Sequence, residues 1–511
     1  MGYKNISLKM PTSFSDGELR KKIANQLHIR NFSFQIENKS LDARNKSNIH
    51  WLLTIAVHSD EIKGGGALPY EPLMIPVKDR NESALVVGNG PAGFFCAFVL
   101  QRAGFEVTMI DRGFEVEKRD RSIELFEKEG IFNPLGNYAF GEGGAGTFSD
   151  GKLTSRSKHI SKERQFILDS YIAAGAPREI AYMAHPHLGT DNLKRIVKKL
   201  RQQFIEAGGK MLFETMMTDI SVKNGQVVEV ITNKGNFNPD RVFIAPGHSA
   251  YDTYRMLMQN GVLFRTKNFA LGSRMEHRQE IINIAQWGKP ALPGVKAAEY
   301  RLTSNADNKH QVYSFCMCPG GMVVPAAAFE KTNIVNGMSY YLRDGRFANA
   351  ACVAGIHPDS LAGKVVSPSE ALDLVEQLEK SFFDFTGNYV APACNISDFL
   401  ESKIKNKKLE SSFPLGLQIA PLWEMLPAHV TSAMRAGLLD FGQKMRNFET
   451  GILLGLESKT SSPVQVLRDD DARCTGFSNL YMLGEGSGYA GGIISSAADG
   501  VKVAMKCILA Q

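Results

Sequence analysis

The chain has 511 residues, of which 43% are hydrophobic and 22% are charged, and its formal net charge is +6. This length predicts two or three domains with sizeable cores. No apolar run reaches the roughly 18 residues that a membrane-spanning helix needs, and the polar start of the chain does not resemble a signal peptide. Seven dispersed cysteines are typical of reduced thiols rather than of a disulfide scaffold. We therefore expect a cytoplasmic protein that does not associate with membranes.

The first 78 residues predict a small α+β module. Ser15 is followed three positions later by Glu18, a capping box that opens a helix with Leu19, Ile23 and Leu27 on one face. Glycines and prolines crowd residues 63–76, which predicts a linker. Because no catalytic set is present in this module, we expect a lid or a docking element for a partner protein. Its strand-like segments are 6–10, 32–37 and 49–58.

Residues 84–111 carry the most informative pattern of the chain. An apolar run at 84–87 leads into GNGPAG at 88–93, an apolar helix that ends near Gly104, a second short strand, and then Asp111. In such a unit the first glycine permits a tight turn, the second lets a pyrophosphate approach the backbone, and the third packs the helix on the strand. The helix amides face the phosphates, and the acid accepts hydrogen bonds from a ribose. The residues predicted to bind a dinucleotide are Gly88, Gly90, Pro91, Ala92, Gly93, Asp111 and Arg112.

A second motif near the end of the chain indicates which dinucleotide is bound. Residues 480–486 read LYMLGEG and residues 490–494 read AGGII, which predicts a buried strand, a glycine with an acid, and a helix start. Here the chain resembles the two-part flavoproteins of the glutathione-reductase type. That resemblance implies FAD rather than NAD, with Gly484 and Glu485 at the ribityl chain and the helix N-terminus at the flavin ring. Glu485 replaces the more usual Asp. The residues that the resemblance places at this helix start are Gly491, Gly492 and Ile493.

Three further segments fit the same architecture. The small-residue loop 141–152 has Gly143 and Gly144 where backbone can lie against the cofactor, although a surface loop is the alternative. We expect a strand over residues 212–220, and the resemblance implies that the backbone around Met217 contacts the adenine. Together with residues 185–191, 247–250 and 485–492, the set resembles a family of bacterial FAD-dependent dehydrogenases of unassigned substrate, over essentially the whole chain. In the segment 241–247, the resemblance places Ala245, Pro246 and Gly247 near the cofactor, with Pro246 in place of Thr.

The implied fold class is α/β, with a discontinuous Rossmann-like FAD-binding domain, an inserted antiparallel β substrate domain and the small N-terminal α+β module. The motifs lie at both ends of the chain after the module, so the FAD-binding domain is expected to comprise residues 79–265 and 400–511. Residues 266–399 then form the inserted domain, which supplies most of the substrate pocket. An amphipathic helix is expected at residues 191–207, with its basic residues on a solvated face.

Catalytic residues are less clearly marked. Disulfide reductases of this fold carry a Cys-x4-Cys pair after the first strand, where this chain has only Cys96, so we do not expect their reaction. Cys316 and Cys318 would share one face of a strand, and buried thiols are the preferred interpretation because a zinc site needs about four ligands. We therefore expect no metal. His185 and His187 are interpreted as part of a turn. The polar candidates for contact with substrate are Lys152, His248, Arg274, Glu276 and His277, of which Lys152 and His277 are the candidate catalytic residues.

These patterns predict an FAD-dependent oxidoreductase that moves a hydride between flavin N5 and a small organic substrate. No second glycine turn of the first kind occurs after residue 150, so electrons would come from transiently bound NAD(P)H, another protein or the substrate. One alternative is a flavin-dependent RNA-modifying enzyme, although we do not expect a nucleic-acid partner. Another is an FAD-binding protein with a non-redox interaction role. The basic run relevant to RNA is Lys403, Lys405, Lys407 and Lys408.

Overall fold

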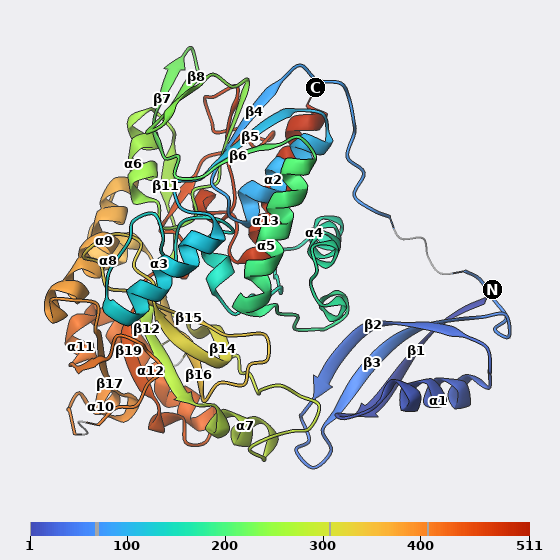
Figure 1. The fold of residues 1–511 in the computed structure, drawn as a ribbon. Helices are drawn as coiled ribbons and strands as arrows, with labels where there is room; N and C mark the ends of the chain where they lie inside the picture. Colours follow the sequence, from blue (N-terminus) through green and yellow to red (C-terminus); the bar gives the residue numbers. More distant parts are fainter. Residues whose placement is uncertain (1, 67–70, 306–307, 406–407, 511) are drawn as a thin grey trace.

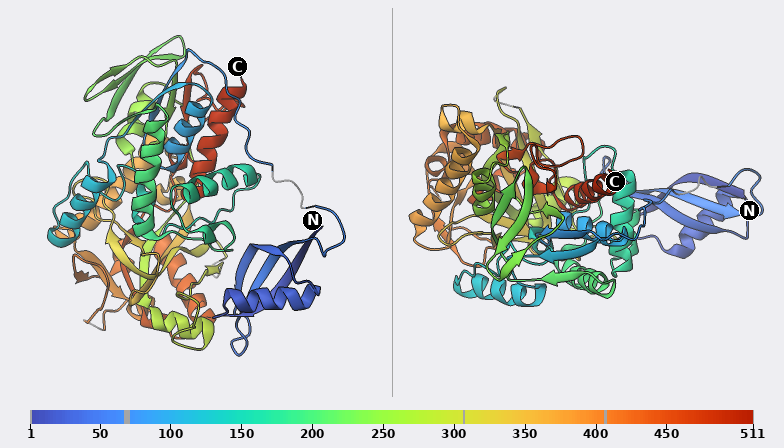
Figure 2. Two further views of the ribbon diagram at one scale, coloured as in Figure 1. Left: turned by 45° about the vertical axis from the view of Figure 1, so that its right-hand side comes forward. Right: turned by 90° about the horizontal axis from the view of Figure 1, so that it is seen from above.

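The structure is a computed structural model that describes residues 2–66, 71–305, 308–405 and 408–510. A small N-terminal module stands to one side of a larger body (Figures 1 and 2). Its three strands form an antiparallel sheet in the order β1-β3-β2. Leu19 and Ile23 of the helix are fully buried against Leu53 and Ile55 of the central strand, and Ser15 forms the predicted capping box. The elements are β1 (Gly2–Pro11), α1 (Asp16–Leu27), β2 (Ser33–Asp42) and β3 (His50–Ser59).

The body contains a five-stranded parallel sheet in the order β21-β10-β4-β5-β6. Strands β4 and β21 are close to opposite ends of the body sequence, which confirms the predicted discontinuous Rossmann-like fold. Helices α2 and α13 pack tightly together, because a Cβ on Gly500 would lie 2.1 Å from the carbonyl oxygen of Ala92. The strands are β4 (Ser83–Val87), β5 (Glu106–Ile110), β6 (Lys210–Leu212), β10 (Arg241–Ile244) and β21 (Leu480–Met482). The helices are α2 (Pro91–Arg102), α5 (Gly189–Glu206) and α13 (Ile493–Leu509).

The continuous strand predicted over residues 212–220 is wrong. The chain leaves β6 after Leu212 and bends, with Glu214 at a φ of 55°, before it starts a separate sheet in the order β7-β8-β9. Residues that follow β5 stabilise the bend. The amide of Glu214 donates to the carbonyl oxygen of Gly113 at 3.0 Å, and the amide of Thr215 donates to that of Asp111 at 2.8 Å. The strands of this sheet are β7 (Met217–Lys223), β8 (Gln226–Thr232) and β9 (Gly235–Phe237).

A larger sheet lies below the parallel one, and its order is β13-β14-β16-β12-β19-β17-β18, with β15 paired to β14. It is antiparallel except for the β17 and β18 pair. The predicted limit of the inserted domain at residue 399 is too early, because β19 pairs with β12 and β17 inside this sheet. The strands are β12 (Phe269–Arg278), β13 (Thr303–Ser304), β14 (Val312–Pro325), β15 (Val335–Met338), β16 (Phe347–Ile356), β17 (Ala391–Asn395), β18 (Leu417–Ile419) and β19 (Ile452–Glu457).

The remaining elements surround these sheets and join them. Strands β11 (Phe264–Thr266) and β20 (Val464–Val466) form a two-stranded antiparallel connection. The helices are α3 (Val116–Glu129), α4 (Ser161–Ala173), α6 (Tyr251–Gln259), α7 (Gln279–Trp287), α8 (Pro358–Ala362), α9 (Pro368–Thr386), α10 (Ile396–Glu401), α11 (Leu422–Met425) and α12 (Ala428–Lys444). Among the residues that the structure describes, no helix is long and apolar enough to cross a membrane.

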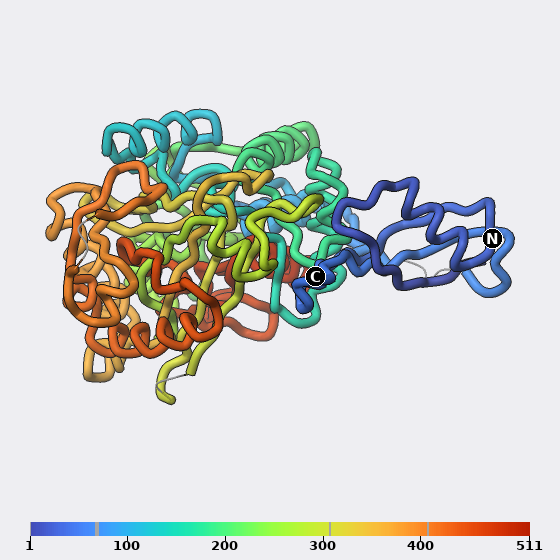
Figure 3. The backbone as a smooth tube through the Cα atoms, turned by 90° about the horizontal axis from the view of Figure 1, so that it is seen from below, coloured from blue at the N-terminus to red at the C-terminus, as the bar shows by residue number. Residues whose placement is uncertain are grey.

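The N-terminal module docks on the body through hydrogen bonds and through apolar contacts of its core with Met183 and Val295. The amide of Lys39 donates to the carbonyl oxygen of Tyr182 at 2.8 Å, and the amide of Ala184 donates back to Lys39 at 3.0 Å. Lys46 also donates to the carbonyl oxygen of Ala285 at 2.7 Å. Seen from below, the module extends away from the body on this side (Figure 3). Part of the predicted linker, residues 67–70, lies outside the described residues.

Candidate functional site

A long pocket crosses the carboxyl ends of the parallel strands and continues onto the antiparallel sheet. Its volume is about 240 Å³. One end is lined by residues that follow β4, β5 and β10, which is where open α/β sheets bind their ligands. The other end is lined by Phe315 and Cys316 of β14, Asn336 of β15, and Lys459, which follows β19. The pocket therefore joins the two sheets of the body.

The glycine turn after β4 has the geometry of a phosphate cradle. Gly88 has a φ of 98°, and a Cβ there would lie 2.2 Å from the carbonyl oxygen of Ala245. A Cβ on Gly93 would lie 1.9 Å from the carbonyl oxygen of Gly88, so the helix packs directly on the turn. A Cβ on Gly90 would only touch Gly144, at 3.8 Å, because Gly90 faces the pocket. No described side chain caps the first turn of α2, which leaves its amides for an anionic group.

The acid at the end of β5 holds this turn in place. Asp111 is buried, and its two carboxylate oxygens accept hydrogen bonds from the amides of Asn89 at 2.7 Å and Gly113 at 2.8 Å. Arg112 forms a bidentate ion pair with Asp252, at 2.9 and 2.6 Å, and lies over the ring of Phe140 at 4.4 Å. Both residues line the pocket, where Asp111 keeps lone pairs that a ribose can use.

The loop at residues 141–146 is fixed from behind by one arginine. Arg119 is fully buried and donates to the carbonyl oxygens of Asn137 at 2.8 Å, Tyr138 at 3.0 Å, and Glu142 and Gly144 at 2.8 Å. With its carbonyls turned toward Arg119, the loop presents Gly144 to the pocket next to Gly90. The alternative of a free surface loop does not describe this segment.

The late motif reaches the middle of the same pocket. Glu485, Gly492 and Ile493 line it, and no described side chain caps α13. Burial raises the pKa of Glu485 to about 8, and negative charge on the nearby sulfur of Cys316 adds to this effect. Glu485 is therefore largely protonated at neutral pH and can donate a hydrogen bond to a polyol chain.

Most of the predicted cofactor residues meet in this one pocket. Four predicted glycines that the structure describes lie outside its lining: Gly93, Gly143, Gly484 and Gly491. The amide of Gly484 donates to Asp499 at 2.7 Å. The predicted residues that line the pocket are Gly88, Gly90, Pro91, Ala92, Asp111, Arg112, Gly144, Met217, Ala245, Pro246, Gly247, Glu485, Gly492 and Ile493.

The prediction of His277 as a catalytic residue is wrong. Its side chain is 2% exposed, its Nε2 lies 2.7 Å from the carbonyl oxygen of Phe448, and its ring packs on the Phe448 ring. Burial lowers its pKa to about 4. Glu276 does not line the pocket either, and its carboxylate accepts hydrogen bonds from Ser411 and Ser412. By contrast, His248 lines the pocket, where burial lowers its pKa to about 3 and keeps it neutral.

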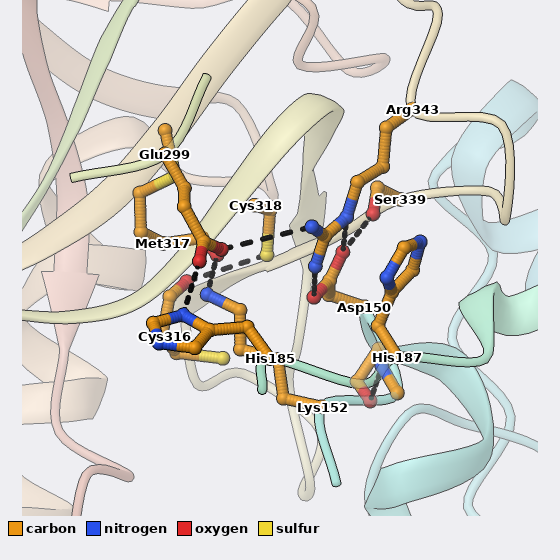
Figure 4. A network of polar contacts seen from close by, with 12 residues as sticks. Asp150, Lys152, His185, His187, Glu299, Cys316, Met317, Cys318, Ser339 and Arg343 are labelled. Atoms are coloured by element: carbon orange, nitrogen blue, oxygen red, sulfur yellow. Dashed lines mark hydrogen bonds and ion pairs between the residues drawn. The ribbon is translucent and has the colours of Figure 1, made fainter. Parts of the chain in front are cut away.

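Lys152 lines the far end of the pocket and belongs to a polar network (Figure 4). Its Nζ donates to the carbonyl oxygen of Met317. Beside it, Asp150 forms a bidentate ion pair with Arg343, at 3.0 and 2.5 Å. Burial raises the pKa of Asp150, but the positive charges of Arg343 and Lys152 outweigh it and lower the pKa to about 2. Asp150 is thus ionised and paired.

Behind this network lies a second cavity, which we call the side cavity. It measures about 340 Å³ and is bounded by the N-terminal module and the body. Arg343 and Glu299 line it, and His185 lies 2.5 Å from Glu299. His187 contacts the backbone instead of an acid: its Nε2 lies 3.0 Å from the carbonyl oxygen of Tyr341. Asp150 lines the long pocket and Arg343 lines the side cavity, so their ion pair, which is drawn in Figure 4, forms a wall between the two cavities.

Four residues at the far end of the pocket, Phe315, Cys316, Asn336 and Lys459, escaped prediction as site residues. Asn336 and Lys459 carry no local motif, and Cys316 was interpreted as a buried thiol. Their position depends on how β14, β15 and β19 pair, which the sequence does not show. Lys459 is buried and forms an ion pair with Glu379 at 2.7 Å.

Other sequence candidates lie outside this pocket or carry no site. Lys405 pairs with Glu401 on a helix end, and Lys407 lies outside the described residues. Within the described part of the chain, no group of three or more His, Cys, Asp or Glu residues is arranged to hold a metal ion.

Comparison with known proteins assigns the chain to a family. A family model described as "FAD-dependent protein, C-terminal domain-like" matches residues 268–460. An uncharacterized protein of Clostridium beijerinckii is 38% identical over 522 residues, which cover 98% of this chain and 97% of that protein.

Solved structures share only a distant similarity of fold. A complex of CtdE with FAD is 10% identical, with a TM-score of 0.35, and the match covers 84% of this chain and 86% of that one. Glycine oxidase from Bacillus cereus is 11% identical, with a TM-score of 0.32 and coverages of 84% and 95%. Similarities at this level say nothing about substrate or reaction.

Proposed function

This chain belongs to one family with the Clostridium beijerinckii protein, and its residues 268–460 match the model of FAD-dependent proteins; on this basis we propose that it is an oxidoreductase that moves a hydride between flavin N5 and a small organic substrate. FAD is the cofactor. The observation that carries the proposal is the long pocket, in which a glycine turn and two uncapped helix N-termini share one lining with the ionisable side chains of Asp150, Lys152, Cys316 and Lys459. A protein that used FAD only as a structural element would not need those side chains.

The residues of this chain would divide the work along the pocket. Asp111 and the turn around Gly90 hold the adenosine and pyrophosphate, and Glu485 holds the ribityl chain. The flavin ring then lies toward Cys316 and Asn336 at the antiparallel sheet. The bound flavin supplies the hydride chemistry, and the chain orients the reactants and excludes water.

Electrostatics at the far end favour negative charge. Lys152 and Lys459 both line it, and the N-terminus of α13 points into the same pocket. Positive groups that are already in position stabilise an anionic reduced flavin or an anionic substrate, because the protein does not have to reorganise during the reaction. His248 is neutral there, so it acts as a hydrogen-bond partner rather than as a cation.

The proposal is tested by the absorbance spectrum of the purified protein, followed by anaerobic titration with NADH and NADPH. We expect a flavin spectrum from non-covalent FAD that is released on denaturation, and bleaching by the physiological donor. If neither nicotinamide bleaches it, small organic donors are tested in the same way. A protein whose flavin no such donor reduces, and whose reduced flavin no acceptor oxidises faster than air does, is not this enzyme.

A further inference from the structure

Cys316 lines the far end of the long pocket, and Cys318 is buried two residues further along the same irregular part of β14. The register of β14 against β16 shifts between Phe315 and Cys318. Cys316 has a φ of 45°, in the left-handed region that residues other than glycine rarely adopt. β-Bulges next to active sites turn a side chain toward the site, and strained backbone is concentrated there too. Here the irregular backbone places Cys316 in the lining of the pocket.

The two cysteines are joined by direct contacts. The thiol of Cys318 donates to the carbonyl oxygen of Cys316 at 3.3 Å, so it is folded back on its neighbour. Arg274 binds both residues, because its Nη2 lies 2.8 Å from the carbonyl oxygen of Cys316 and 3.7 Å from the Cys318 sulfur. Arg274 is fully buried and is held by an ion pair with Glu457 at 2.7 Å. A permanent positive charge therefore lies beneath this pair of sulfurs.

The thiol of Cys316 differs from those of the other cysteines, whereas the pKa of Cys318 is raised well above its ordinary value by its hydrogen bond to Cys316 and by burial. A hydrogen bond from Cys318, together with the charges of Arg274 and Lys152, lowers the pKa of Cys316. The nearby acids are Glu457 and Asp150, each paired with an arginine, and Glu485, whose pKa burial raises to about 8. Burial raises the pKa of Cys96, Cys352, Cys394, Cys474 and Cys507, which keeps those thiols protonated and unreactive.

We propose that Cys316 and Cys318 form a redox couple, dithiol in one state and disulfide in the other, that exchanges an electron pair with the bound flavin. When the dithiol is oxidised, a bond forms between the two sulfurs and both thiol protons are lost. The two electrons and one proton reduce FAD to its anionic reduced form, and the other proton passes to solvent. The reverse reaction consumes one proton and restores the thiols. The protein would thus store a second electron pair beside the flavin.

The inference rests on the proposed function, because it requires a redox-active flavin at this end of the pocket. The test is an anaerobic titration with dithionite of holoprotein that has been oxidised with diamide and desalted. We expect wild-type protein to take up about twice as much dithionite per flavin as a simple flavoprotein, since flavin and disulfide each accept two electrons. Cys316→Ser and Cys318→Ser should each take up the ordinary amount.

Cys352→Ser is the matched control, because Cys352 is a buried cysteine on the neighbouring strand β16. It should behave as the wild type. A second readout does not need flavin or variants: after diamide treatment, alkylation under denaturing conditions should label two fewer of the seven cysteines. Peptide mapping should then find one disulfide, between Cys316 and Cys318. This measurement decides the question if a serine variant fails to fold.

Uptake of one dithionite equivalent by oxidised wild-type protein, with all seven thiols labelled, would overturn the couple and leave the proposed oxidoreductase intact. The opposite result is a protein that takes up twice the ordinary amount of dithionite although no substrate or nicotinamide reduces its flavin. In that case the couple would be real and the proposed reaction would fall.

Discussion

At the scale of single residues, Gly90 separates cofactor binding from folding. Gly90→Val places a branched side chain in the pocket, where the nearest atom of the protein is 3.8 Å from the new Cβ, so the fold should survive. We expect retained FAD to fall at least about tenfold, equivalent to about 1.4 kcal/mol of binding free energy. The measurement is the flavin to protein ratio beside circular dichroism.

Gly93→Ala is the contrasting variant, because its Cβ would lie 1.9 Å from a backbone oxygen. It should lower the free energy of unfolding, by roughly 1 to 3 kcal/mol. A folded Gly90→Val protein with full FAD would show that the turn does not hold the pyrophosphate.

Asp150 and Arg343 provide a test of the wall between the two cavities. Arg343→Met leaves the buried carboxylate of Asp150 without its bidentate partner. Breaking such a pair from one side typically costs about 3 to 5 kcal/mol of unfolding free energy. The double variant Asp150→Asn with Arg343→Met should recover part of that loss, as measured by urea unfolding.

The same pair predicts a pH dependence. The folded pKa of Asp150 is lowered from 3.8 to about 2, so its stabilising contribution is present above 3.8 and is lost as the pH falls toward 2. The difference between wild type and Arg343→Met should therefore shrink in that window. An equal difference at all pH values would mean that charge is not the cause.

Glu485 should give a pH dependence of stability opposite to that of Asp150. Burial raises its pKa from 4.5 to about 8, so this group contributes stability below pH 4.5 that is lost as the pH rises through about 8. Glu485→Gln stays neutral and should remove this loss. The check is the Tm of the FAD-free protein across this range. Parallel curves for the two proteins would contradict the raised pKa.

At the scale of secondary structure, local signals predict the cofactor end of the site better than the substrate end. The turn at Gly88 and the start of α13 are predictable, because each combines a buried strand, glycines and a helix within a few residues. Cys316 and Lys459 are not, because strand pairing across distant segments brings them to the pocket. His277 was misassigned because its position on β12 faces Phe448 in the core. The boundary at residue 399 failed because β19 returns to the centre of the larger sheet.

The start of α13 is the element that would distinguish a flavin site from a plain nucleotide site. Gly492 lines the pocket at a φ of 78°, which proline cannot adopt. Gly492→Pro therefore removes an amide donor and displaces the first turn. If one charge-assisted hydrogen bond of about 2 to 4 kcal/mol to the reduced flavin is lost, the midpoint potential should fall by roughly 40 to 90 mV. An unchanged potential with normal FAD content would mean that α13 does not face the flavin.

At the scale of the whole molecule, the cofactor site and the N-terminal module are separable. Every residue that lines the long pocket lies between Val87 and Ser496, whereas the module ends with β3 at Ser59. The module has its own core around Leu19, Ile23 and Leu53, and it closes one side of the side cavity with Lys39 and Trp51. The body therefore contains every residue that lines the long pocket, and the module, which stands beside the body in Figure 2, contributes lining residues to the side cavity.

This division predicts the result of removing the module. A chain that begins at residue 71 should keep a flavin to protein ratio equal to that of the full chain, because no residue of the pocket is lost. Its stability should fall somewhat, because Met183 and Val295 of the body, which pack against the module core, become exposed to water. Flavin absorbance and thermal unfolding measure the two effects separately. If the shortened chain is folded but has lost its FAD, the module must support the pocket from the side cavity, through the ion pair of Arg343 and Asp150.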